Sequence, residues 1–234
     1  GGGAAGGGGA CGPPPAPGPL SALKKMTGFR EQLLQPLTLG FMAFFALSVL
    51  SFQLYVGTAR LQLEAKGDSD DTGYFYTKAV NVFISCGLVA LPLNFWALDK
   101  KGYTVTLGLI LTFGVLSACM QIVPTLELQI LTFIFWTLGR FMLYSCWFSM
   151  FLVLFGVQNF GKLIAVVSFA TAALGLLQLP LTSVGLKQLG GDRWWVLNIA
   201  QVAWLLPLYS FVWRMRRWER EEGAAAEAMR QWQA

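Results

Sequence analysis

The chain has 234 residues, of which 55% are hydrophobic and 12% are charged, and its net charge is +5. An average soluble domain has about a quarter of its residues charged, so this composition excludes an ordinary water-soluble fold and favours a membrane protein. In a membrane protein the excess of Lys and Arg reflects the orientation in the membrane and contact with anionic lipid, so it does not indicate nucleic-acid binding. The chain has no histidine, the usual general base and the commonest transition-metal ligand, so we expect no enzyme activity, cofactor or metal site.

The chain divides by composition into three parts. Residues 1–18 are almost entirely Gly, Ala and Pro, which cannot bury a core, so we expect a disordered lead there. The predicted parts are this lead with a basic cytoplasmic segment (1–30), a transmembrane bundle (31–213) and a basic, Ala-rich cytoplasmic tail (214–234). The tail predicts a short helix on the membrane surface.

Apolar stretches long enough to cross about 30 Å of hydrocarbon recur six times. They are predicted at Pro36–Val56, Phe75–Leu98, Tyr103–Val123, Leu128–Phe155, Leu163–Val184 and Trp194–Trp213, with a polar loop at 57–73 and kinks at Pro92 and Pro180. Strands of a membrane barrel alternate apolar and polar residues over about ten positions, whereas these stretches are continuous. The predicted fold class is an all-α membrane protein with six transmembrane helices.

Lysine and arginine divide unequally between alternate loops. One side carries Lys24, Lys25, Arg30, Lys100, Lys101, Lys162, Arg214, Arg216, Arg217, Arg220 and Arg230; the other carries Arg60, Lys66, Lys78, Lys187 and Arg193. Because cytoplasmic loops are enriched in these residues, both termini are predicted to be cytoplasmic. The pattern does not distinguish the plasma membrane from an internal membrane.

Arg140 is the most informative single residue, because it falls near the middle of the fourth predicted span. A guanidinium there costs a few kcal/mol (about 2.5 to 3.5 on insertion scales), so we expect it to face the bundle interior or a water-filled cavity. The alternative is a structural role against backbone carbonyls. Tyr144, one helical turn on, lies on the same predicted face.

Polar residues in the first two spans are further candidates. Gln53, Asn81 and Ser85 are predicted to line a substrate path, and interhelical hydrogen bonding is an equal alternative. The segment from Asp68 to Gly73 superficially resembles the start of a calcium loop, but the twelfth position is alanine, so helix capping is the better interpretation.

A charged turn joins the second and third spans. Asp99, Lys100, Lys101 and Gly102 form it, and the alternatives are a plain basic loop or a gate in which Asp99 pairs with a cation of a neighbouring helix. This turn resembles the cytoplasmic signature loop of the major facilitator superfamily, in the copy between the eighth and ninth helices. The resemblance implies a carboxy-terminal six-helix half, whose partner is the missing amino-terminal half or a second chain.

Three stretches are similar to a narrower family. Residues 126–140 (LELQILTFIFWTLGR), 159–163 (NFGKL) and 176–180 (LLQLP) resemble solute carrier family forty-three, the facilitated, system L type neutral amino-acid transporters. The resemblance implies sodium-independent movement of large neutral amino acids and assigns Arg140 to the arginine of the corresponding helix. The family also includes a carrier of purine nucleobases.

The leading hypothesis is therefore half of a facilitated, alternating-access carrier of small organic solutes, most of all large neutral amino acids. Arg140, Tyr144, Gln53, Asn81 and Ser85 are its candidate path residues, and the Asp99 turn is its candidate gate. The alternatives are a nucleobase carrier, a non-transporting membrane scaffold or regulatory protein, and a dimer of such chains.

Overall fold

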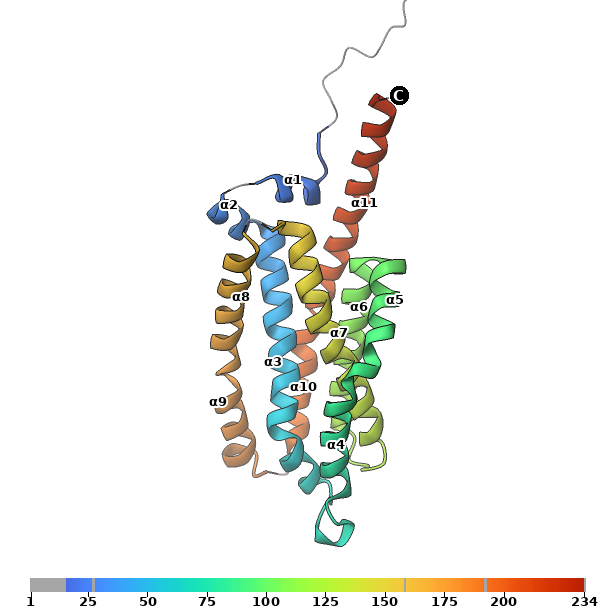
Figure 1. Ribbon diagram of the computed structural model, residues 1–234. Helices are drawn as coiled ribbons and strands as arrows, with labels where there is room; N and C mark the ends of the chain where they lie inside the picture. The colour runs from blue at the N-terminus through green and yellow to red at the C-terminus, as the bar shows by residue number, and fades with distance from the viewer. Residues whose placement is uncertain (1–15, 27, 158, 192, 234) are drawn as a thin grey trace, which may run out of the picture.

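The computed structural model describes residues 16–26, 28–157, 159–191 and 193–233, and within them the chain forms helices and turns without a strand (Figure 1). Six helices or runs of helices in this described part are long and apolar enough to cross a membrane. They are α3 (Pro36–Ala65); α4 (Phe75–Ser85), η2 (Cys86–Ala90) and α5 (Leu91–Lys101); α6 (Tyr103–Ile122); α7 (Gln129–Phe155); α8 (Phe160–Gly175), α9 (Gln178–Ser183) and η3 (Val184–Gln188); and α10 (Trp194–Leu205) and α11 (Leu208–Gln233). The predicted all-α membrane fold with six spans is confirmed.

Helix α3 forms the centre of the bundle. Two thirds (67%) of its most apolar stretch is buried, and it contacts α7, α8, α9 and α10. Aromatic side chains fill the space around it, including the fully buried Phe44 and Trp136. The Trp136 indole also donates a hydrogen bond from Nε1 to the Phe52 carbonyl oxygen across 3.1 Å, which ties α7 to α3.

The second and fifth spans lie on opposite flanks of α3 and are both broken (Figure 1). In the second span a 3₁₀ segment precedes Pro92, and in the fifth a turn separates α8 from α9, which contains Pro180 and leads into a π-helical end. Proline has no amide hydrogen to donate, so the regular hydrogen-bond ladder is interrupted at these positions. These two spans are also the least buried, at 22% and 17% of their apolar stretches.

Two expectations about span ends are corrected. Helix α3 continues to Ala65, so the first half of the predicted loop at 57–73 is helical. Buried hydrogen bonds allow these polar residues to lie within the helix. The Gln62 amide donates to the Thr58 hydroxyl (2.8 Å), and its carbonyl oxygen accepts from Asn198 Nδ2 of α10 (3.1 Å). These bonds satisfy polar groups that would otherwise be costly inside the bundle.

The predicted surface helix at the carboxyl end is instead the outer part of α11, which continues from the last span and projects beyond the bundle (Figure 1). Two of its carboxylates hold other helices. Glu219 Oε1 accepts a hydrogen bond from the Thr104 amide at the start of α6 (3.1 Å). Glu222 Oε2 accepts from the Leu20 and Ser21 amides of α1 (Pro19–Lys25), at 3.0 and 3.2 Å. Free amides at a helix start favour an acidic partner, so the tail is anchored to the bundle.

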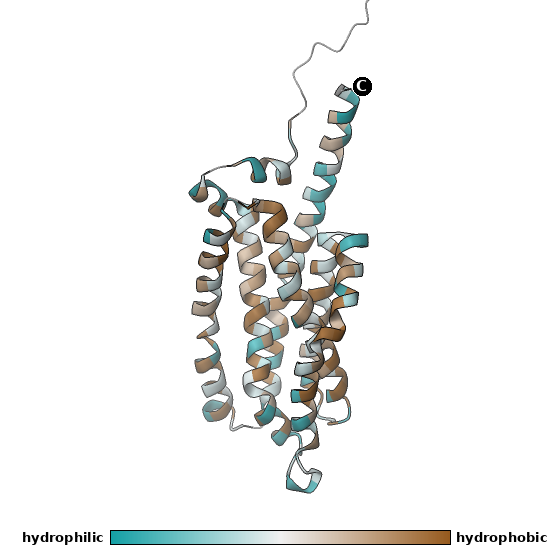
Figure 2. Cartoon of the chain, in the orientation of Figure 1, coloured by the Kyte–Doolittle hydropathy of each residue, from teal (hydrophilic) through white to brown (hydrophobic). Residues whose placement is uncertain are grey.

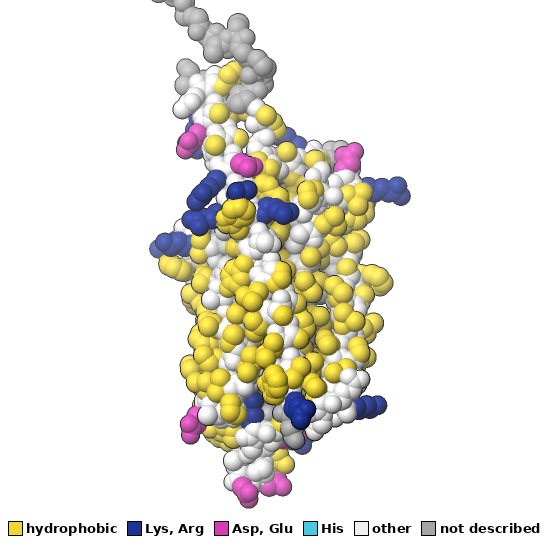
Figure 3. Space-filling view, turned by 180° about the vertical axis from the view of Figure 1, so that it is seen from behind, with side chains coloured by type: hydrophobic (Ala, Val, Ile, Leu, Met, Phe, Trp, Pro, Cys, Tyr) yellow, Lys and Arg dark blue, Asp and Glu magenta, His cyan; other side chains and the backbone are white. Residues whose placement is uncertain are grey.

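Hydrophilic residues gather at the two ends of the bundle, with hydrophobic residues between them (Figures 2 and 3). Helix α1, the short α2 (Phe29–Leu33) and the tail of α11 share one end, and the turn after α3 lies at the other (Figure 1). Residues 1–15 of the predicted lead lie outside the described residues. Which end faces the cytoplasm stays a prediction from the distribution of Lys and Arg.

Candidate functional site

A cavity of about 370 Å³ lies between α3, α7 and the broken fifth span. Its position follows from helical periodicity, because residues four apart share one face of a helix. Helices α3 and α7 contribute aromatic and aliphatic walls, and α8 and α9 contribute small and polar residues. The lining consists of Phe45, Val49, Gln53, Tyr144, Trp147, Phe148, Ser168, Thr171, Ala172, Gly175 and Gln178.

Stacked rings form the aromatic wall. The Phe45 and Trp147 rings are nearly parallel, with an interplanar angle of 16° and centroids 3.6 Å apart. Tyr144 meets Phe45 edge to face, with ring centroids 6.0 Å apart. The Phe45 and Trp147 side chains are both buried, so packing holds the planes of these rings.

The polar part of the lining carries amides and hydroxyls and no charged side chain. The carboxamides of Gln53 and Gln178 have no hydrogen-bond partner within the described part of the chain. Gln178 begins α9, directly after the break that follows Gly175, so the interruption of the helix opens the cavity wall. Both amides can therefore donate to and accept from a ligand without breaking a bond inside the protein.

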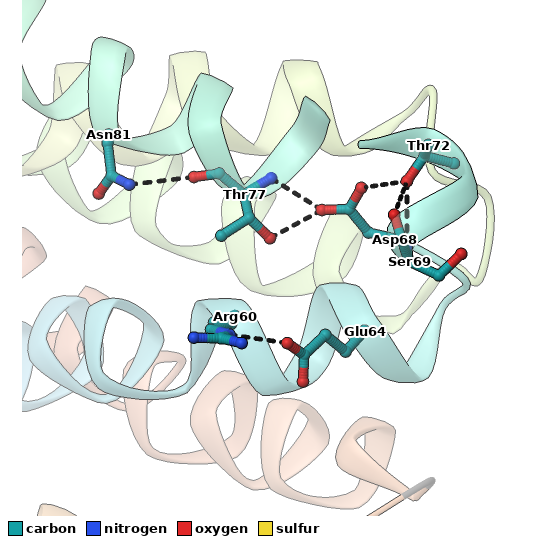
Figure 4. Close-up of polar contacts among 7 residues, drawn as sticks. All are labelled: Arg60, Glu64, Asp68, Ser69, Thr72, Thr77 and Asn81. Carbon is teal, nitrogen blue, oxygen red and sulfur yellow. Dashed lines mark hydrogen bonds and ion pairs between the residues drawn. The ribbon is translucent and has the colours of Figure 1, made fainter. Parts of the chain in front are cut away.

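The structure brings together two of the predicted path residues, Gln53 and Tyr144, in the wall of this cavity. It does not bring Asn81 and Ser85 there. Their side chains are exposed on α4 and bond to carbonyls of their own helix: Asn81 Nδ2 donates to the Thr77 oxygen (3.1 Å; Figure 4), and Ser85 Oγ donates to the Asn81 oxygen (3.0 Å).

Arg140 lies on α7 one turn before Tyr144 and is half-buried. Its guanidinium carbon lies 5.1 Å from the centroid of the Trp136 ring and 5.9 Å from that of Tyr144, so two rings hold it through cation–π contacts. No carboxylate of the described residues lies within 4 Å of it. Arg140 is not part of the cavity lining, although it shares Tyr144 with it. Its predicted role at a substrate path stays a prediction.

The predicted gating turn links α5 directly to α6. Gly102 has a φ of +84°, a conformation that glycine adopts readily, and Asp99, Lys100 and Lys101 are exposed. Within the described residues, no cation lies within 4 Å of the Asp99 carboxylate. Glu219 accepts a hydrogen bond from the Thr104 amide, two residues after this turn, and the sequence did not indicate this contact because the two residues are more than a hundred positions apart.

The turn after α3 has a structural role at the other end of the bundle (Figure 4). Asp68 is buried, and its carboxylate accepts hydrogen bonds from the Thr77 amide (2.9 Å), the Thr77 hydroxyl (2.7 Å) and the Thr72 hydroxyl (2.8 Å). Burial favours the protonated acid, but these bonds outweigh it and lower the pKa of Asp68. Asp68 thus caps the start of α4, as expected. No group of three or more residues that could hold a metal occurs within the described ranges.

No family model and no solved structure matches the chain. Its sequence is similar to that of a transporter. Over 109 residues it is 35% identical to equilibrative nucleobase transporter 1 of Bos taurus. The similar segment covers 47% of this chain and 21% of the bovine protein, so the chain matches about a fifth of that protein's length. This similarity and the six apolar helices support a multi-pass membrane protein of transporter type. Membership of solute carrier family forty-three and of the major facilitator superfamily stays a prediction.

Proposed function

We propose that this chain is part of a facilitated carrier that moves a neutral, planar heterocycle of the nucleobase type through the cavity between α3, α7 and the fifth span. The observation that carries the proposal is the character of the cavity: stacked rings on one side, free amides on the other, and no charge in the lining. The similarity to a nucleobase transporter supports the same substrate class.

The chemistry of a nucleobase matches this lining. Its flat face stacks on aromatic side chains at about 1–3 kcal/mol per base, and its edge carries donors and acceptors that a glutamine amide can pair in a bidentate manner. A zwitterionic amino acid would bring an ammonium and a carboxylate into a lining without a counter-charge, and burying an unpaired charge is costly. The cavity therefore favours the uncharged ligand.

A large neutral amino acid is the second candidate, and Arg140 is the observation that favours it. Its guanidinium has no carboxylate partner within 4 Å in the described residues, and it shares Tyr144 with the cavity. A substrate carboxylate could pair with it in a bidentate manner. Replacing Arg140 with leucine would then abolish leucine uptake and leave nucleobase uptake within about twofold, which separates the two candidates.

Movement of the substrate requires the cavity to open alternately to the two sides of the membrane. Two spans can bend where their helices are interrupted. The second span is interrupted at the 3₁₀ segment before Pro92, and the fifth span at the turn before Pro180. The exposed faces of the same two spans are the surfaces that the rest of the carrier or a second chain would cover. In this proposal both termini are cytoplasmic and the Asp99 turn moves with the gate.

Uptake of radiolabelled adenine, hypoxanthine and leucine by cells that express the complete gene product tests the proposal. Saturable uptake of a nucleobase that excess leucine does not inhibit is the expected result. Saturable leucine uptake without nucleobase uptake would support the second candidate. Uptake of none of these solutes, with the protein present at the membrane, would overturn transport and favour a scaffold or regulatory protein.

A further inference from the structure

A second hollow, which shares no lining residue with the cavity, lies between α6 and α11. It is an open groove of about 800 Å³. Its lining, called the α6–α11 groove below, consists of Lys101, Thr104, Val105, Gly108, Leu109, Thr112, Tyr209, Val212, Trp213, Arg216, Glu219 and Arg220. None of these residues lines the cavity beside α3, and one of them, Lys101, belongs to the Asp99 turn of the proposed gate.

One end of the groove is basic. Lys101, Arg216 and Arg220 are exposed there, and within the described residues no carboxylate lies within 4 Å of them. The single carboxylate in the lining, Glu219, is already engaged by the Thr104 amide (3.1 Å). The three cations are thus available to an anion from outside the chain.

The rest of the groove is apolar and runs along the two helices. Val105 and Leu109, four residues apart on one face of α6, line it together with Val212 and Trp213 of α11. Gly108 lines the groove without a side chain, and an added Cβ atom would make an ordinary contact of 3.8 Å with Val212 Cγ1. The far end is closed by a hydrogen bond of 2.9 Å between the Thr112 and Tyr209 hydroxyls.

The position of the groove relates it to the membrane. Figure 3 shows Lys and Arg side chains at both ends of the bundle, with more of them near the projecting helix, and a broad hydrophobic belt between the two ends. Trp213 is exposed, and Arg217 stacks on its ring at 3.7 Å, an arrangement typical of the boundary between lipid headgroups and hydrocarbon. The groove passes from this boundary into the hydrophobic belt.

We propose that the α6–α11 groove binds one anionic glycerophospholipid. Its phosphate is held by Lys101, Arg216 and Arg220, and one acyl chain lies along Val105, Leu109 and Val212. A soluble phosphate would leave the apolar part empty, and a zwitterionic lipid such as phosphatidylcholine would bring its quaternary ammonium close to the three cations, which offsets the attraction of its phosphate. The basic end and the apolar channel together therefore select a ligand that has both parts.

Native mass spectrometry of the purified chain in neutral detergent tests the proposal, with phosphatidylglycerol and phosphatidylcholine as probes. We expect one phosphatidylglycerol to bind at least tenfold more tightly than phosphatidylcholine. The double variant Lys101→Gln/Arg216→Gln should weaken phosphatidylglycerol binding about 25-fold, because each cation near an anionic lipid contributes about fivefold. The matched control Arg214→Gln/Arg230→Gln removes two exposed cations of α11 outside the groove and should change binding less than threefold.

A second variant tests the apolar part. Gly108→Leu fills the groove while leaving every cation in place, and it should reduce phosphatidylglycerol binding at least tenfold with unchanged helix content by circular dichroism. Equal binding of the two lipids, an equal loss in the control variant, or normal binding to folded Gly108→Leu would each overturn the proposal. Equally effective competition by soluble glycerol phosphate would also overturn it, because the acyl chain would then contribute nothing.

Discussion

Replacing Gln53 with leucine tests the cavity as a substrate site more directly than any other change. The two side chains are similar in size, so the substitution removes the carboxamide and leaves the packing of α3 largely intact. Because the Gln53 amide has no partner within the described part of the chain, its removal breaks no internal hydrogen bond. A change in transport would then report contact with the substrate.

The expected magnitude follows from the hydrogen bonds that one carboxamide can make. A neutral hydrogen bond contributes about 1 kcal/mol net, which is a factor of about five in affinity. A nucleobase edge can make one or two such bonds with Gln53. We therefore expect the KM for nucleobase uptake to rise about 5- to 30-fold in Gln53→Leu, measured by initial rates of radiolabelled uptake over a range of concentrations.

Two further glutamines supply the controls. Gln188→Leu makes the same change at an exposed site outside the cavity and should leave both KM and melting temperature unchanged. Gln62→Leu breaks the buried bonds to Thr58 and Asn198 and should lower the melting temperature without a specific rise in KM. An unchanged KM in folded Gln53→Leu, for nucleobases and amino acids alike, would refute the assignment of this cavity.

Three structural predictions concern other parts of the bundle. Burial lowers the pKa of Lys66 from 10.5 to about 8, so between these pH values the unfolded chain holds a proton that the folded chain has lost. The free energy of unfolding should therefore rise with pH, by up to about 3 kcal/mol in total. Melting in detergent from pH 7.5 to 10.5 should show this rise, and Lys66→Met should abolish it. Gly87→Ala should destabilise the bundle by about 1–3 kcal/mol, because the added Cβ atom would overlap the Phe141 ring, and an unchanged melting temperature would contradict this packing. Glu222→Ala should remove about 1 kcal/mol from the anchoring of α1, seen as faster amide exchange at residues 19–25 with no change elsewhere in the bundle.

Hydropathy was sufficient to predict the six spans, because a membrane helix must satisfy its own backbone within one continuous apolar stretch. Hydropathy placed the end of α3 too early, because the polar residues Thr58 and Gln62 lower the mean hydropathy of its last turns. Their partner Asn198 lies on α10, and a local pattern cannot reveal a bond between residues so distant in sequence. The same limit hid Glu219, whose contact with α6 spans more than a hundred residues.

Two residues of the cavity lining were among the path residues predicted from the sequence, and their role in transport stays a prediction. Gln53 and Tyr144 line the same cavity, because a polar residue in an apolar helix avoids lipid and turns inward. Asn81 and Ser85 follow the same reasoning yet bond to carbonyls of their own helix, an alternative that sequence cannot distinguish. The sequence analysis did not name Gln178 as a site residue. Its position two residues before Pro180, within an apolar span, could have indicated that the helix is interrupted there and exposes a polar side chain.

The two hollows of the bundle differ in the property that decides what each can hold. The cavity beside α3 has rings and amides without charge, and it lies against the turn where the fifth span is interrupted. The α6–α11 groove has charge at one end and continuous helix on both sides. A site that must release its ligand benefits from a wall that can bend, and one that keeps a membrane lipid benefits from a wall that cannot. The cavity wall contains a helix break, whereas α6 and α11 are each continuous along the groove, and this difference is the physical reason to assign transport to the cavity and lipid binding to the groove.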